Sequence, residues 1–228
     1  MLPSHKFRIQ ITGPSGIGKT TMAKEVEKVM GIDYISSSYH DLFPNLPKKH
    51  TDLMEIPKDD MVMDEYRLLS RRYQLYLAHN YNGYVTDRSM VDSIAYFIEK
   101  LAHKVAACET EDFITKAIKT IDTDCVDLII FLPFTKNHIK GWSIEDDNKR
   151  ITNPYYQFKM SSIINSVIFD ILSPELINTD NQVLLFKRGK VFFSVIEEMD
   201  LLERLQIVKT VVSQIYEQYH EADSHHIF

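Results

Sequence analysis

The sequence has few cysteines and no long hydrophobic run. Its two cysteines, Cys108 and Cys125, lack the paired spacing of a zinc site or a disulfide framework, so a reducing compartment is the simplest interpretation. The most apolar stretch, Leu128–Phe134, is far shorter than the ~20 residues that cross a bilayer. The segment Met1–Gln10 lacks the apolar run of a secretion signal. We therefore predict a cytoplasmic protein without a membrane segment.

Positive charge is also in deficit, because 26 Lys and Arg residues stand against 32 Asp and Glu residues, for a formal net charge of −6. A negative chain is repelled by a phosphate polymer, so the charge disfavours a nucleic-acid partner and leaves a small anionic ligand open. The 228 residues, 44% of them hydrophobic, suffice for one domain with an ample core. We therefore predict a single domain over residues 1–228, and the sequence leaves its oligomeric state open, a homodimer included.

Glycine is scarce as well, yet three of the seven glycines fall within the segment GPSGIGKTT. Before this segment, Phe7–Thr12 alternates apolar and polar residues as a strand does, and after it apolar residues recur at helical spacing until Gly31. Strand, glycine loop and helix in this order are the context of the P-loop pattern GxxxxGK[ST]. The predicted nucleotide-binding residues are Gly13, Pro14, Ser15, Gly16, Ile17, Gly18, Lys19, Thr20 and Thr21.

The chemistry of phosphate binding explains these residue types. Glycines allow successive backbone N–H groups to turn toward one phosphate, and the following helix directs the positive end of its dipole at the same anion. Lys19 would reach the β- and γ-phosphates of ATP, and Thr20 would offer its hydroxyl to Mg²⁺. The alternative is a tight turn without a ligand. The sequence therefore predicts ATP and Mg²⁺ as cofactors.

The rest of the chain alternates predicted strands with predicted helices. Strands are expected at 33–36, 84–86, 126–132 and in at least one half of a hairpin over 183–196. Helices with an apolar face are expected at about 61–80, 89–105, 110–121, 153–172 and 199–219. In the last helix, Leu202 and Leu205 are expected in the core. Such alternation predicts a three-layer α/β fold of the P-loop NTPase type, with a mainly parallel five-stranded sheet, helices on both faces and a small lid.

The segment Asp87-Arg88-Ser89 follows the predicted strand at 84–86, at the sheet edge where α/β proteins bind ligands. Asp87 is a candidate general base or holder of the Mg²⁺ water shell, and a structural strand-end cap is the alternative. Arg88 is a candidate partner of an acceptor oxygen or phosphate, against an ordinary surface ion pair. Ser89 and Asp92 form a capping-box pattern before the next helix.

Other P-loop classes match the sequence less well. The chain contains neither the NKxD nor the DxxG pattern of Ras-type GTPases, and Asp127 stands at the wrong end of its strand for the Walker B acid of a motor ATPase. Instead, TDRSMVDSIAYF is similar to the (D/E)RS element of deoxynucleoside kinases, and thymidylate kinases carry a related DR(Y/F). The run from Asp146 to Leu172 resembles the ribosylnicotinamide-kinase-like group of small P-loop ATPases, which includes many phage proteins. The chain lacks the acidic EPV element and the arginine-dense lid of the deoxynucleoside kinases.

The resemblance to P-loop nucleoside and nucleotide kinases implies transfer of the γ-phosphate of ATP to a nucleoside or a nucleoside monophosphate. Two alternatives remain: a kinase that acts on a hydroxyl in DNA or RNA, such as a hydroxymethylated base or a strand end, and a nucleotide-binding regulatory ATPase. Lys19, Asp87, Arg88 and Arg150 are the candidate catalytic residues, and Thr20 and Asp87 are the candidate metal ligands.

The acceptor is expected at residues 37–80, and the lid over residues 134–153. Arg67, Arg71 and Gln74 form one polar stripe of the helix that faces the acceptor in related kinases, and a solvated face is the alternative. Gln74 is the candidate for a base edge and Arg71 for an acceptor phosphate, and Asp41 is a reserve general base. Arg150 of the lid would close over the transferring phosphate, unless it is simply solvated.

Overall fold

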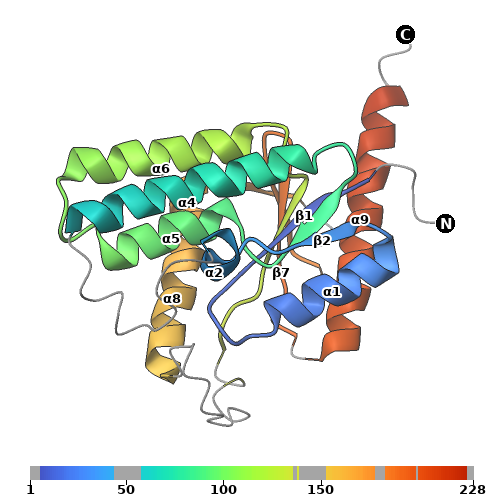
Figure 1. The fold of residues 1–228 in the computed structure, drawn as a ribbon. Coiled ribbons are helices and arrows are strands. Elements are labelled where there is room, and N and C mark those ends of the chain that lie inside the picture. Colours follow the sequence, from blue (N-terminus) through green and yellow to red (C-terminus); the bar gives the residue numbers. More distant parts are fainter. Residues whose placement is uncertain are drawn as a thin grey trace.

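The computed structural model of the chain describes residues 6–43, 58–135, 138, 153–177, 183–198 and 200–224. A seven-stranded sheet lies at its centre (Figure 1). The strands are β1 (Arg8–Thr12), β2 (Asp33–Ile35), β3 (Tyr84–Thr86), β4 (Leu128–Phe131), β5 (Glu175–Ile177), β6 (Leu185–Arg188) and β7 (Val191–Val195). Their order across the sheet is β2-β3-β1-β4-β7-β6-β5.

The sheet has more strands than the sequence predicts. β2, β3, β1, β4 and β7 are parallel, and these five correspond to the expected parallel sheet. Two antiparallel strands, β6 and β5, extend it beyond β7. Both halves of the predicted hairpin are strands, because the chain turns at Gly189 with a positive φ of 56° and pairs with itself. The prediction of five strands was therefore wrong in number and right for the parallel part.

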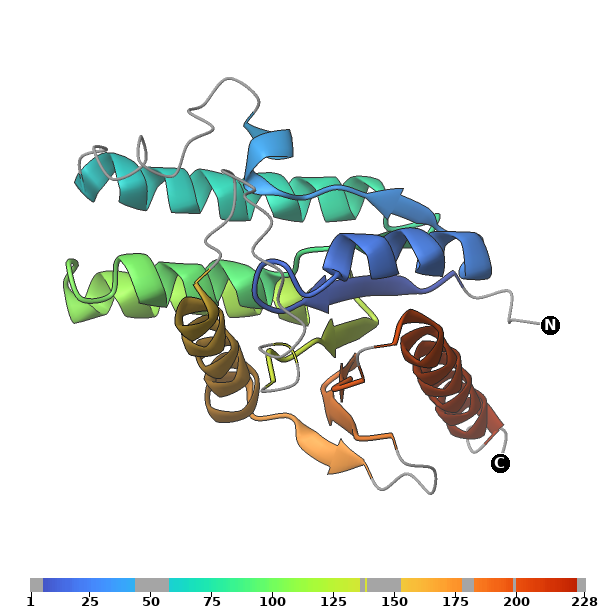
Figure 2. The same ribbon diagram turned by 90° about the horizontal axis from the view of Figure 1, so that it is seen from below.

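Helices cover both faces of the sheet, as predicted. They are α1 (Lys19–Met30), α2 (Tyr39–Leu42), α4 (Lys58–Ala78), α5 (Met90–Lys100), α6 (Ala107–Asp122), α8 (Pro154–Ser166), which continues into the π-helical segment η1 (Val167–Leu172), and α9 (Leu201–Ser224). α1 and α9 bury Met22, Val26 and Val208 against one face. α4, α5, α6 and α8 form a second core with the other face. Figure 2 shows the two groups of helices on either side of the strands.

The parallel pairing determines where the predicted functional segments meet. Gln10 of β1 lies opposite Thr86 of β3, so the loop that leaves β1 starts beside Asp87, which follows β3. In a parallel sheet the carboxyl ends of all strands share one edge, and ligands bind there. In the described part of the chain, no helix is both long enough and apolar enough to cross a membrane.

Candidate active site

The P-loop leaves β1 through a glycine that packs against the neighbouring strand. A Cβ on Gly13 would lie 2.4 Å from the carbonyl oxygen of Leu132, which follows β4, and Gly13 has a φ of 145°. Gly16 and Gly18 also have positive φ values, of 84° and 87°. A larger residue at Gly13 would push the loop off the sheet. The glycines that the motif requires therefore have a steric cause in this chain.

Lys19 is the first residue of α1, and it is buried with 6% of its surface exposed. Its Nζ donates to the carbonyl oxygens of Gly13 and Pro14, at 2.7 and 2.5 Å. The side chain of Lys19, at the end of the loop, therefore reaches back to the first residues of the loop. A cation at this place can neutralise charge on a bound phosphate chain.

Thr20 and Asp87 form the contact between the P-loop and β3. The Thr20 hydroxyl donates to Oδ2 of Asp87 at 2.5 Å, although 67 positions separate the two residues in the chain. Asp87 is 6% exposed, and its Oδ1 is buried without a hydrogen-bond partner among the described residues. Leaving a buried carboxylate oxygen unsatisfied costs about 1–3 kcal/mol or more. Such an atom needs an explanation, and a bound ligand supplies one.

The oxygens at this contact are suited to Mg²⁺. Mg²⁺ prefers hard oxygen ligands, keeps several waters and is held by one or two carboxylates together with substrate phosphates. Asp87 offers one free carboxylate oxygen, and Thr20 offers a hydroxyl beside it. Among the described residues, no group of three or more acidic, histidine or cysteine side chains forms a complete metal cage. The residues present therefore match a phosphate-bound Mg²⁺ rather than a metal held by protein ligands alone.

Tyr34 and Asp41 lie near Asp87. Burial, followed by the negative charge of Asp87, raises the pKa of Tyr34 to about 12, and Asp41 acts in the same direction. Asp41 itself accepts hydrogen bonds from the hydroxyls of Ser36 and Ser38, and Ser38 is the N-cap of α2. The structure thus gives Asp41 a role in capping α2, and its catalytic role stays a prediction.

Arg88 is directed toward α5 by residues of that helix. Its Nη1 lies 3.4 Å from Oδ1 of Asp92, and its guanidinium lies over the ring of Tyr96 at 5.7 Å. Asp92 is fully buried and also completes the capping box with Ser89, as predicted. The ion pair with Asp92 that holds Arg88 is therefore only partly exposed, at 21% for the arginine. Such a fixed guanidinium can bind an acceptor oxygen without first losing much conformational entropy.

The predicted acceptor residues of α4 lie on its exposed face. Arg67 pairs with Asp64 at 3.0 Å, which is an ordinary helix-surface contact. Arg71 donates to the carbonyl oxygen of Leu42, and its guanidinium lies 4.2 Å from the centre of the Phe43 ring. Arg71 therefore connects α4 to the end of α2, whereas Gln74 is exposed. Their role in acceptor binding remains a prediction.

The sequence analysis missed a buried polar network beneath Asp87 and Arg88. Arg72, 4% exposed, donates to the carbonyl oxygen of Ser37 at 3.1 Å and to the Ser93 hydroxyl at 2.6 Å. Tyr76 donates to the Arg88 carbonyl oxygen at 2.9 Å. α4 is thus bound both to the end of β2 and to the segment after β3. Helical spacing places Arg72 on the buried stripe with Leu68 and Tyr76, and this was the available signal.

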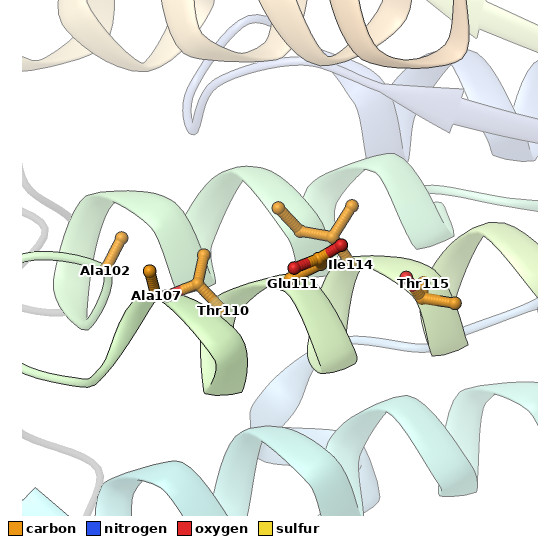
Figure 3. A pocket seen from close by; sticks show the side chains of 6 residues that line it. All are labelled: Ala102, Ala107, Thr110, Glu111, Ile114 and Thr115. Carbon is orange, nitrogen blue, oxygen red and sulfur yellow. The ribbon is translucent and has the colours of Figure 1, made fainter.

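Most of the predicted lid, residues 134–153, lies outside the described residues. Phe134, Thr135 and His138 are described, whereas residues 136–137 and 139–152, Arg150 among them, lie outside the described residues. A pocket of about 370 Å³ lies elsewhere, and its lining comes from α6 and the turn after α5 (Figure 3). It contains none of the candidate site residues. The candidate site is therefore defined by the P-loop, Asp87 and Arg88.

Comparisons with known proteins agree with this architecture. Residues 8–167 match a family described as an AAA domain. Deoxyadenosine kinase from M. mycoides with bound dATP has a TM-score of 0.59 at 16% identity, and the match covers 91% of this chain and 99% of that one. The same enzyme with the products dCMP and dCDP gives 0.60 at 13% identity, covering 92% and 100%. YorR from Bacillus subtilis, in complex with phosphorylated GDP, gives 0.50 at 13% identity, covering 93% and 97%.

These likenesses confirm the predicted α/β fold with a mainly parallel sheet and helices on both faces. At such low identity they show the fold alone and leave the substrate open. No curated protein matches the chain by sequence.

Proposed function

The chain belongs to the AAA-domain family that its residues 8–167 match, and we propose that it is an ATP-dependent phosphotransferase. It would move the γ-phosphate of ATP to a nucleoside or a nucleoside monophosphate. The contact between Thr20 and Asp87 carries this proposal, since it brings a carboxylate with one free oxygen to the P-loop. A carboxylate oxygen beside the P-loop could hold Mg²⁺ or accept the proton of an acceptor hydroxyl, and both roles would serve phosphoryl transfer.

Phosphoryl transfer requires positioning and charge neutralisation more than covalent chemistry. In the proposed enzyme, the P-loop N–H groups and Lys19 hold the phosphates of ATP. Thr20 and Asp87 would hold Mg²⁺ or its water shell, and the ion would supply further neutralisation of the phosphate charge. Asp87 would also accept the proton of an acceptor hydroxyl, and Arg88 would bind an acceptor oxygen.

The acceptor is proposed to be small. The fold is shared with kinases whose solved structures contain dATP or dCMP, and this supports a nucleoside or nucleotide acceptor. The net charge of −6 weighs against a DNA or RNA acceptor. Among the described residues, Arg71 and Gln74 of α4 remain the proposed contacts to such an acceptor, with Arg67 beside them, and Arg150 of the lid is proposed to assist transfer.

An acceptor screen tests the proposal. The full chain is incubated with Mg²⁺, ATP and single nucleosides or nucleoside monophosphates, while ADP release and product mass are measured together. We expect ADP formation that depends on one acceptor and a product heavier by one phosphoryl group. Lys19→Ala should abolish it, whereas Lys28→Ala, an exposed lysine of the same helix, should not.

Other outcomes would identify other functions. ADP that forms at the same rate with every acceptor and with none would indicate a regulatory ATPase and contradict the proposal. Label from γ-labelled ATP that appears only in added DNA or RNA would indicate a polymer kinase. Absence of ADP under all conditions would overturn the assignment to phosphotransferases.

A further inference from the structure

A buried arginine from the last helix contacts the P-loop. Arg204 lies in the first turn of α9 and is 5% exposed, although arginine is almost never buried without a partner. Its Nη1 donates to the carbonyl oxygen of Ile17 at 2.9 Å, and its Nε donates to that of Glu198 at 2.5 Å. Both acceptors are backbone oxygens. Arg204 therefore connects α9, the segment after β7 and the P-loop.

The peptide between Ile17 and Gly18 transmits this contact to the phosphate site. It is trans, so its carbonyl oxygen and its N–H point in opposite directions. With the Ile17 oxygen held by Arg204, the Gly18 N–H points away from the guanidinium. A Cβ on Gly18 would lie 3.3 Å from Arg204 Nη1, so the arginine also packs directly against this residue. The orientation of one loop N–H is thus determined from outside the loop.

Gly18 occupies a sensitive place in the loop. It is the N-cap of α1, where backbone N–H groups have no partner within the helix and form an anion site. Lys19, the next residue, binds the carbonyl oxygens of Gly13 and Pro14 at the other end of the loop. Two cations therefore hold different carbonyl groups of the same loop, one from within the motif and one from α9.

We propose that Arg204 is a positioning residue for nucleotide binding, which holds the Ile17 carbonyl so that the Gly18 N–H faces the phosphates. This inference rests on the proposed function, because it requires that the loop bind ATP. A guanidinium on the carbonyl also polarises the peptide and makes its N–H a stronger donor. Burial lowers the pKa of Arg204, and the Glu198 carboxylate partly offsets this effect. A nearby anionic ligand would offset it further.

Binding of two ligands to the full chain tests the proposal. ATP and inorganic tripolyphosphate are titrated separately in the presence of Mg²⁺ by calorimetry. Arg204→Met removes both hydrogen bonds and keeps an apolar side chain, and we expect both affinities to fall by about tenfold or more. Arg204→Lys keeps the charge and lacks the planar fork, so it should give an intermediate loss for both ligands.

Arg188→Met is the matched control. Arg188 also donates to a backbone oxygen, that of Leu172 at 2.6 Å, but it is the last residue of β6 and lies at the opposite edge of the sheet. This variant should bind both ligands as the wild type does. Thermal unfolding of all variants shows which of them fold. If Arg204→Met does not fold, the affinities of Arg204→Lys decide the question.

The remaining outcomes would overturn the inference. Unchanged affinities in a folded Arg204 variant would show that the loop needs no support from α9. A loss for ATP with none for tripolyphosphate would show that Arg204 acts on the base or ribose instead. If the wild type itself bound neither ligand, the proposed function would fail first, and this inference with it.

Discussion

Two buried aspartates at opposite edges of the sheet differ in how their oxygens are used. Asp127, 2% exposed, precedes β4 and binds Arg8 through both oxygens, with the backbone N and Nε of Arg8 at 2.9 Å from Oδ2 and Nη2 at 2.5 Å from Oδ1. Asp87, 6% exposed, uses Oδ2 for Thr20 and leaves Oδ1 without a partner among the described residues. The oxygens of Asp127 are thus satisfied by Arg8 within the chain. The free oxygen of Asp87 could instead bind a ligand.

We therefore expect Asp127 to contribute to stability and Asp87 to contribute to function. The edge that holds Asp127 is closed by contacts within the chain. The edge that holds Asp87 contains the P-loop, which we propose to bind the phosphates of ATP. A bound cation would satisfy a carboxylate oxygen at this edge of the sheet.

The largest effect is expected for Asp87→Asn. It should lower acceptor-dependent ADP formation by about 10²–10⁴-fold, because the amide can neither accept a proton nor hold Mg²⁺ as a carboxylate does. The free energy of unfolding should change little, since no ion pair is lost. Steady-state turnover and thermal unfolding measure the two quantities. Asp33→Asn, an exposed aspartate of β2, is the control. Turnover close to that of the wild type would contradict the role of Asp87.

Asp127→Asn should give the opposite pattern. It leaves the partly buried Arg8 without its counter-charge, and we expect the free energy of unfolding to fall by about 3 kcal/mol. Turnover of the folded fraction should persist. Urea unfolding provides the measurement. Asp124→Asn removes the exposed pair with Lys190, which is worth about 0–1 kcal/mol, and so controls for loss of a negative charge nearby. An equal fall in the free energy of unfolding for Asp127→Asn and Asp124→Asn would contradict the structural role of Asp127.

The smallest effect concerns the pH dependence of stability. The pKa of Tyr34 is raised from 10.0 to about 12 in the folded chain, so the unfolded chain ionises first as pH rises. The folded chain favours the neutral Tyr34 hydroxyl. This contribution to the free energy of unfolding is complete below pH 10 and is lost between about pH 10 and 12. Tyr34→Phe should therefore make the fall in stability over this range less steep. Urea unfolding at several pH values measures the slope, and Tyr81→Phe, an exposed tyrosine, should leave it unchanged.

Local patterns of the sequence predicted much of the fold correctly. The P-loop follows β1, Gly31 ends α1, and Ser89 and Asp92 form the expected capping box. Each of these features depends on residues within one strand or one turn of helix. The prediction that Asp127 lies away from the ligand edge was also correct, because it needs only the direction of the strand.

The errors concern residues whose partners are far away in the chain. Leu202 was expected in the core and is 75% exposed. The buried stripe of α9 runs through Leu205, Val208 and Ile215, and at its start Arg204 takes the buried position. A count of apolar residues places Leu202 in the core. In the structure Arg204 is buried at this position instead, because its guanidinium donates to the carbonyl oxygen of Ile17.

Three features could be predicted from the order of the residues alone: the P-loop, the alternation of strands and helices, and the aspartate after β3. These follow from residue types and spacings, which act over a few positions. The contact of Thr20 with Asp87, the contacts of Arg72 with two other segments and the contact of Arg204 with the P-loop, 187 positions away, became visible only in the folded chain. Arg72 and Arg204 both donate to backbone oxygens, those of Ser37, Ile17 and Glu198. Every residue carries such an oxygen, so no sequence pattern marks the one that a distant arginine will bind.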